Sequence, residues 1–88
     1  MPHVSIKHWP RPFTAAAQAE LVGSLTETIT RTFGCEPDSV SIAVESVEPS
    51  RWRDEVQLPE LEQRAHLLWK QPKHTQPLSA ARTAEGTR

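Results

Sequence analysis

The order of hydrophobic periodicities in the first half of the chain constrains its fold more than any other sequence feature. Apolar and polar residues alternate over about residues 2–8, and they alternate again over residues 40–45. Between these runs, apolar residues recur at spacings of three and four, which predicts an amphipathic helix over about residues 14–33. A strand, a helix and a strand joined by short connections form a βαβ unit. The sequence therefore predicts two parallel strands with a right-handed crossover.

Residues with special backbone preferences mark the ends of these elements. Pro10 and Pro12 cannot donate to a strand ladder, so the first strand should end near residue 8. Thr14 is a suitable N-cap for the helix, and Gly34 suits the left-handed conformation that often follows a helix. These signals agree with the limits that the periodicity predicts.

The predicted βαβ unit is too small to be a complete domain. The chain has 88 residues, and chains near this size bury only about 60–65% of the surface that they expose when unfolded. Two strands under one helix also leave an open sheet edge and uncovered apolar surface. A second copy that extends the sheet across a two-fold axis would pair the open edge and cover the apolar surface. We therefore expect an α/β (α+β) fold that dimerises into a four-stranded sheet.

Charge, cysteine content and hydropathy argue against several kinds of binding partner and structural element. The formal net charge of −1 gives no electrostatic reason to expect nucleic acid or an anionic membrane. The single cysteine, Cys35, cannot form an internal disulfide, and its separation from the histidines matches no zinc site. No apolar run is long enough for a signal peptide or a membrane span. We expect a cytoplasmic protein without a metal.

The pattern changes after the second strand. Residues 49–52 resemble one helical turn that begins with Pro49. An apolar stripe then predicts a short second helix over residues 59–70. Residues 73–88 contain almost no large apolar side chain, which is typical of a disordered tail. The predicted folded domain therefore covers residues 1–72.

The start of the first strand carries a residue that can become reactive. Met1 is followed by Pro2, and an initiator methionine is usually removed before a small residue such as proline. Removal would turn the Pro2 nitrogen into a secondary amine. Free N-termini titrate at about 7.7–8.0, and an apolar pocket lowers this pKa because it disfavours the cation. Pro2 is therefore a candidate general base, although a Met-Pro start is also commonplace in proteins without such chemistry.

Four short segments, in this order, resemble the tautomerase superfamily, whose small namesake is 4-oxalocrotonate tautomerase. They are Met1-Pro2-His3, then Ile6-Lys7 followed by Pro10-Arg11, then Ser39-Val40-Ser41-Ile42, and finally Glu48-Pro49-Ser50-Arg51-Trp52. The resemblance covers roughly residues 2–72. It is closest to the short bacterial phenylpyruvate-type tautomerases that assemble as dimers, and it implies a tautomerase fold with a homodimeric assembly.

The resemblance also implies roles for particular residues. Pro2 corresponds to the catalytic base of the family, Arg11 to the arginine that holds the substrate carboxylate, and Trp52 to the aromatic wall of the pocket. The namesake has an arginine in its second strand where this chain has Ser41, which makes a dicarboxylate a less suitable substrate. The longer segment after Trp52 should obstruct the hexamer of the namesake.

The implied reaction is proton transfer in a small 2-oxo acid or its enol, without a cofactor. His3, Ser5 and Lys7 alternate onto one strand face, so one of them could stabilise the enolate oxygen, and periodicity does not choose among them. Apart from the resemblance, Arg11 is more typical of a solvated loop residue, and Trp52 could also fill a dimer core.

Two other functions remain compatible with the sequence. A neutral secondary amine is also a nucleophile, so decarboxylation, dehalogenation by hydration or iminium-forming chemistry would use the same Pro2. If Met1 is retained, the nitrogen is an amide, and the chain would instead be a non-catalytic dimeric binding protein.

Overall fold

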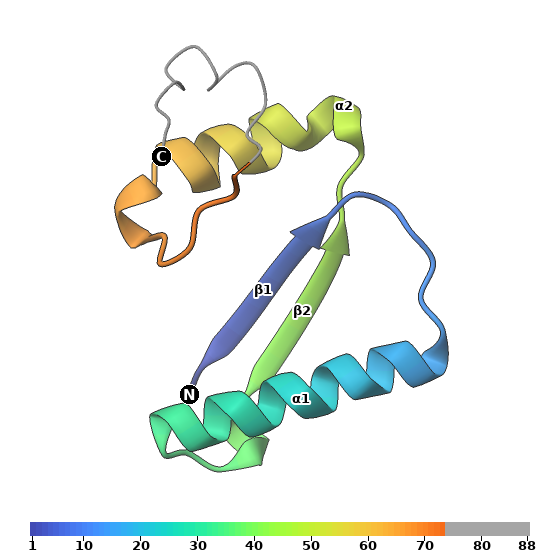
Figure 1. Cartoon of the computed structure of the whole chain (residues 1–88), viewed down its shortest axis with the longest axis vertical. Coiled ribbons are helices and arrows are strands. Elements are labelled where there is room, and N and C mark those ends of the chain that lie inside the picture. The colour runs from blue at the N-terminus through green and yellow to red at the C-terminus, as the bar shows by residue number, and fades with distance from the viewer. Residues whose placement is uncertain (74–88) are drawn as a thin grey trace.

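A βαβ unit forms the first half of the computed structural model, which describes residues 1–73 (Figure 1). Strand β1 covers His3–His8, helix α1 covers Ala15–Phe33 and strand β2 covers Ser41–Ser46. The two strands are parallel and pair in register from His3 opposite Ser41 to His8 opposite Ser46. The predicted order, the parallel pairing and the α/β (α+β) fold class of the single chain are confirmed.

The caps of α1 explain why the helix has these limits. The Thr14 hydroxyl accepts a hydrogen bond of 3.0 Å from the Ala17 N–H, which satisfies one of the free donors at the helix start. Gly34 has a φ of 66°, and its N–H donates to the Thr30 carbonyl at 2.9 Å. Since a side chain is strained at positive φ, glycine suits this position. Both caps predicted from the sequence are confirmed.

The segment after β2 contains the helical turn that was predicted, but the second helix lies elsewhere. Helix α2 covers Pro49–Trp52 and has proline in its first turn, as expected. It continues directly into a π-helix over Arg53–Glu62, and a short 3₁₀ turn follows at Ala65–Leu67. The predicted helix over residues 59–70 is therefore wrong.

The position of Pro59 explains why the observed helix differs from the predicted one. The sequence favoured Pro59 as a helix start, whereas the structure has it inside the helix that begins at Pro49. Proline has no N–H and cannot complete the α-helical bond to the residue four positions earlier. A wider π-helical turn bonds five residues back, as in the 2.9 Å bond from the Gln63 N–H to the Leu58 carbonyl. The helix therefore accommodates the proline and ends soon after it.

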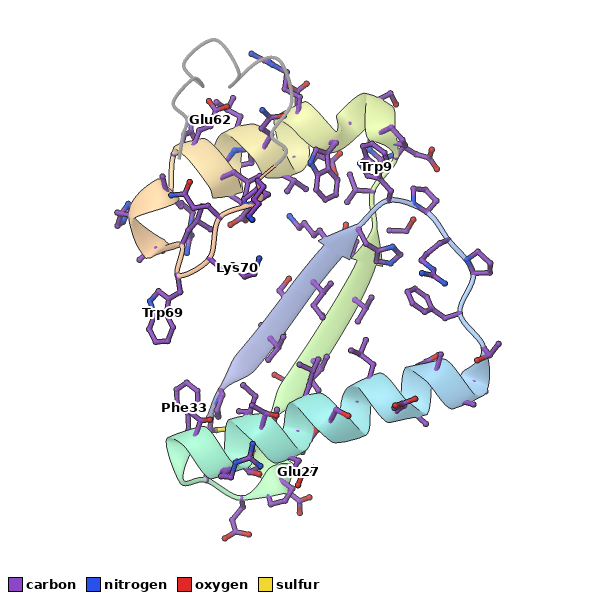
Figure 2. All side chains as sticks on the ribbon, in the orientation of Figure 1. Trp9, Glu27, Phe33, Glu62, Trp69 and Lys70 are labelled. Atoms are coloured by element: carbon purple, nitrogen blue, oxygen red, sulfur yellow. The ribbon has the colours of Figure 1, made fainter. Side chains whose placement is uncertain are left out.

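Little apolar surface is buried within one chain. Among the described residues, the buried side chains are Val47, Val56 and Gln57, and α1 contains no buried residue. Phe33 is 64% exposed and Trp69 is fully exposed, with its ring projecting away from the ribbon (Figure 2). The folded chain thus keeps much of the uncovered apolar surface that the sequence predicts.

The part of the chain that the structure describes contains no helix long and apolar enough to cross a membrane. Within residues 1–73, no group of three or more histidine, cysteine, aspartate or glutamate side chains could hold a metal ion, and Cys35 is a free thiol. The disordered tail predicted for residues 73–88 lies outside the described residues, apart from Lys73.

Candidate active site

Pro2 lies immediately before β1 and is half-buried. Its carbonyl accepts a hydrogen bond of 3.2 Å from the Ser41 N–H at the start of β2. Met1 is fully exposed, so its removal would cost no buried contact. The strand pairing thus fixes the Pro2 backbone beside an N-terminal residue that packs against nothing.

His3 and Ser41 lie next to Pro2. They face each other across the parallel pair, and the His3 Nδ1 is 2.7 Å from the Ser41 Oγ. Both residues are exposed. Ser41 therefore bonds to two consecutive residues, since its N–H reaches Pro2 and its hydroxyl reaches His3. The sequence analysis noted Ser41 within one of the four family-like segments and as a departure from the namesake, and the strand register is the signal that pairs it with His3.

Lys7 and Trp52 lie near the other end of the sheet. The Lys7 Nζ makes a long contact of 3.5 Å with the Glu55 carbonyl. Glu55 lies in the π-helix Arg53–Glu62, so this contact joins the end of β1 to the segment after β2. Trp52 is half-buried and packs edge-to-face against Trp9, with 6.3 Å between the ring centroids. The two predicted site residues are thus positioned by the segment after β2.

Arg11 is exposed in the loop between β1 and α1. Its guanidinium lies 5.0 Å from the centroid of the Phe13 ring, and its Nε donates a long bond of 3.4 Å to the Pro12 carbonyl. Within residues 1–73 it forms no ion pair. Its charge is therefore available to a carboxylate, whose geometry the planar guanidinium matches.

One chain does not bring all five predicted site residues together. A strand rises about 3.3 Å per residue, so Pro2 and His8 are about 20 Å apart along β1. Pro2 and His3 lie at the start of this strand, whereas Lys7 is near its end and Arg11 follows it. Trp52 contacts Trp9 and so belongs to the far end as well. The residues form two groups at opposite ends of the sheet.

An open groove of about 380 Å³ lies between α1 and the sheet. Its walls are mainly apolar and come from both strands, the loop that contains Arg11 and helix α1. The lining residues are His8, Arg11, Phe13, Gln18, Leu21, Val22, Ile42, Val44 and Ser46. The groove therefore leaves apolar side chains of α1 and β2 without a covering layer.

Two tautomerases are similar in sequence to most of this chain. The chain is 33% identical over 72 residues to Tautomerase PptA of Pectobacterium carotovorum subsp. carotovorum, a match that covers 82% of this chain and 95% of that protein. It is 38% identical over 56 residues to Tautomerase PptA of Cronobacter sakazakii, covering 64% of this chain and 74% of the relative. No protein-family model matches the chain. The chain belongs to the tautomerase family and is an isomerase-type enzyme, as the resemblance implied.

Proposed function

We propose that this tautomerase interconverts the keto and enol forms of a small 2-oxo acid such as phenylpyruvate, with the Pro2 amine as general base after removal of Met1. The observation that carries this proposal is the place of Pro2, half-buried at the start of β1 and next to a fully exposed Met1. An amine fixed to a strand by the Ser41 bond is positioned for repeated proton transfer.

The proposed reaction moves one proton. The Pro2 nitrogen removes a proton from C3 of the 2-oxo acid, and the electron pair of the broken C–H bond becomes the new C2–C3 double bond. The carbonyl π electrons move onto the C2 oxygen, which becomes an enolate. The protonated Pro2 then gives its proton to that oxygen, and the reverse sequence regenerates the keto acid. Atoms and charge balance without a cofactor.

A homodimer completes this site in our proposal. The support is the sparse core of the single chain, the open sheet edges and the apolar groove beside α1. A two-fold axis that extends the sheet sets the strands of the two copies antiparallel. The Pro2 end of one sheet then lies toward the far end of the other, which carries Arg11 and Trp52.

This arrangement assigns the remaining binding roles. Arg11 of the second copy would hold the substrate carboxylate, because its guanidinium has no ion-pair partner among the described residues. Trp52 of the second copy would cover the Pro2 nitrogen and stack on an aromatic substrate. Lys7 belongs to the same far end and adds positive charge near the carboxylate. A monocarboxylate with one aromatic ring fits this set.

The nitrogen itself is the part to test. An arginine inserted between Met1 and Pro2 prevents removal of Met1, so the Pro2 nitrogen stays an amide and cannot accept a proton. We expect this insertion to lower kcat/KM for phenylpyruvate by at least about 100-fold, the lower end of what a general base contributes. Intact mass verifies the N-terminus of each sample. Pro2→Ala, whose processed form has a primary amine, should keep part of the activity.

Equal activity of the inserted and processed forms would overturn the proposed base. Borohydride treatment in the presence of substrate separates the other use of the same amine. Covalent trapping during turnover would indicate iminium chemistry at Pro2 rather than proton transfer.

A further inference from the structure

We propose that His3 and Ser41 form a catalytic pair, in which the His3 ring donates a hydrogen bond to the C2 oxygen of the substrate as that oxygen becomes an enolate. This inference rests on the proposed function, because it assigns the group that works opposite the Pro2 amine. The observation that carries it is the 2.7 Å contact between the His3 Nδ1 and the Ser41 Oγ, next to Pro2.

The position of the pair separates it from Lys7, one of the two other candidates on this strand face. Periodicity places His3 and Lys7 on the same face, but the Lys7 Nζ contacts the Glu55 carbonyl near the far end of the sheet. His3 is adjacent to Pro2 in the chain, and a carbon acid held at the Pro2 nitrogen has its C2 oxygen only two bonds from the reacting carbon. Of these two residues, only His3 lies at the Pro2 end of the strand, where the proposed function holds the reacting atoms.

Ser41 fixes both partners of the reaction at once. Its N–H bonds to the Pro2 carbonyl at 3.2 Å, and its hydroxyl bonds to the His3 ring. One residue therefore sets the distance between the base and the imidazole. Rates depend strongly on the relative placement of catalytic groups, and bonds from one residue to both groups would keep that placement constant.

The contact with Ser41 occupies Nδ1, so Nε2 is the ring nitrogen left to face the substrate. When the Ser41 O–H donates to Nδ1, the proton of a neutral imidazole is on Nε2. Among residues 1–73, Nε2 has no hydrogen-bond partner, and His3 is exposed, so a substrate oxygen can reach this N–H. The ring keeps its proton throughout. It donates only a hydrogen bond to the enolate, while Pro2 carries the proton that moves.

Steady-state kinetics of four variants test the pair. His3→Leu removes the donor and should lower kcat for phenylpyruvate by about 100-fold, the typical loss for one oxyanion donor. His3→Gln supplies an amide N–H in a similar place and should recover about 10-fold of this loss. Ser41→Ala leaves the ring without its anchor and should lower kcat by about 10-fold, whereas Ser41→Thr, which restores the hydroxyl, should recover it.

The division between kcat and KM separates catalysis from a structural role. The enolate exists only after proton transfer, so losing its donor should lower kcat and leave KM within about two-fold. Matched controls are His66→Gln and Ser24→Ala, which change an exposed histidine and an exposed serine away from the site. Both should have the kinetics of the unchanged chain. Circular dichroism checks that each variant is folded, and the Ser41 variants decide the question if those of His3 do not fold.

Two results would overturn the pair. One is an unchanged kcat in His3→Leu or Ser41→Ala. The other is a loss that appears equally in the Thr and Ala variants of Ser41, which would mean that the hydroxyl is irrelevant. The chain with an arginine inserted before Pro2 keeps this test separate from the proposed function. If that chain is inactive and the His3 variants are fully active, Pro2 is the base and only the pair is wrong.

Discussion

The two ends of the β1–β2 sheet are built differently. At the start of β1, Pro2, His3 and Ser41 are joined by hydrogen bonds, and both members of the His3–Ser41 pair are exposed. At the other end, the Val47 N–H donates to the His8 carbonyl at 2.8 Å, and Val47 is fully buried. The segment after β2 adds a tryptophan pair at this end. One end is polar and open, and the other is apolar and packed.

This difference suits the two ends of the sheet to different parts of the proposed reaction. The open end presents the groups suited to proton transfer, and the packed end presents a cation and aromatic rings suited to binding an aryl carboxylate. About 20 Å separates the ends within one chain, so in the proposed function neither end alone is a complete site. The proposed homodimer would place opposite ends of two chains together, and variants at each end test this arrangement.

Among substitutions at the packed end, replacement of Arg11 should lower kcat/KM the most. Arg11→Ala removes the charge proposed to hold the substrate carboxylate, and a charge-assisted bond is worth about 1.5–3 kcal/mol. We expect kcat/KM to fall by about 10–100-fold, mainly through KM, and Arg11→Lys to recover part of it. Arg31→Ala, which changes an exposed arginine on α1, should have no effect. A fall confined to kcat would contradict the role in binding.

Trp52 should give a smaller effect with a signature in pH. If its ring covers the Pro2 amine, it excludes water and disfavours the ammonium form, which lowers the pKa of that amine. The active base is the neutral form, so the rate should rise with pH. Trp52→Ala should move the midpoint of kcat/KM upward, toward the range of about 7.7–8.0 for free N-termini. The same profile in Trp52→Ala as in the unchanged chain would remove this tryptophan from the site.

A matched control exists for Trp52. Trp69 is a fully exposed tryptophan and points away from the ribbon (Figure 2). Trp69→Ala should leave both the rate and its pH profile unchanged. A shift in this control as large as that in Trp52→Ala would mean that the effect is not local.

Trp9 should give the smallest effect, on stability rather than on rate. Trp9→Ala removes the edge-to-face contact with Trp52, and such aromatic pairs contribute about 0.5–1.5 kcal/mol beyond their buried area. Thermal melting should show a modest loss, and Phe33→Ala, at an exposed position at the end of α1, should show less. If both variants melt at the same temperature, the tryptophan pair does not stabilise the packed end.

The sequence was sufficient for the βαβ unit because local preferences and periodicity agree there. Thr14 and Gly34 cap the helix as expected, and both strands lie within one residue of their predicted limits. The segment after β2 was harder, because Pro59 is a good helix start by local preference. The helix there begins at Pro49, and its π-helical continuation contains the second proline, Pro59.

The site was predictable only in part. Periodicity correctly put His3, Ser5 and Lys7 on one strand, but the choice between His3 and Lys7 depends on which end of the sheet each occupies. Register pairs His3 with Ser41, and register is a property of two strands that neither strand carries alone. Likewise, the extended strand β1 separates Pro2 from Arg11 and Trp52, and this distance becomes apparent only in the folded structure.

A mixed dimer tests the central claim, that Pro2 of one chain works with the packed end of the other. One chain would carry the arginine insertion before Pro2, and its partner would carry Arg11→Ala with a free Pro2. With different tags on the two chains, the mixed dimer can be purified and assayed with phenylpyruvate. It contains one site with a free Pro2 and an intact Arg11 from the other chain, so we predict about half of the unchanged activity. A mixed dimer no more active than the two parent variants would contradict the shared site.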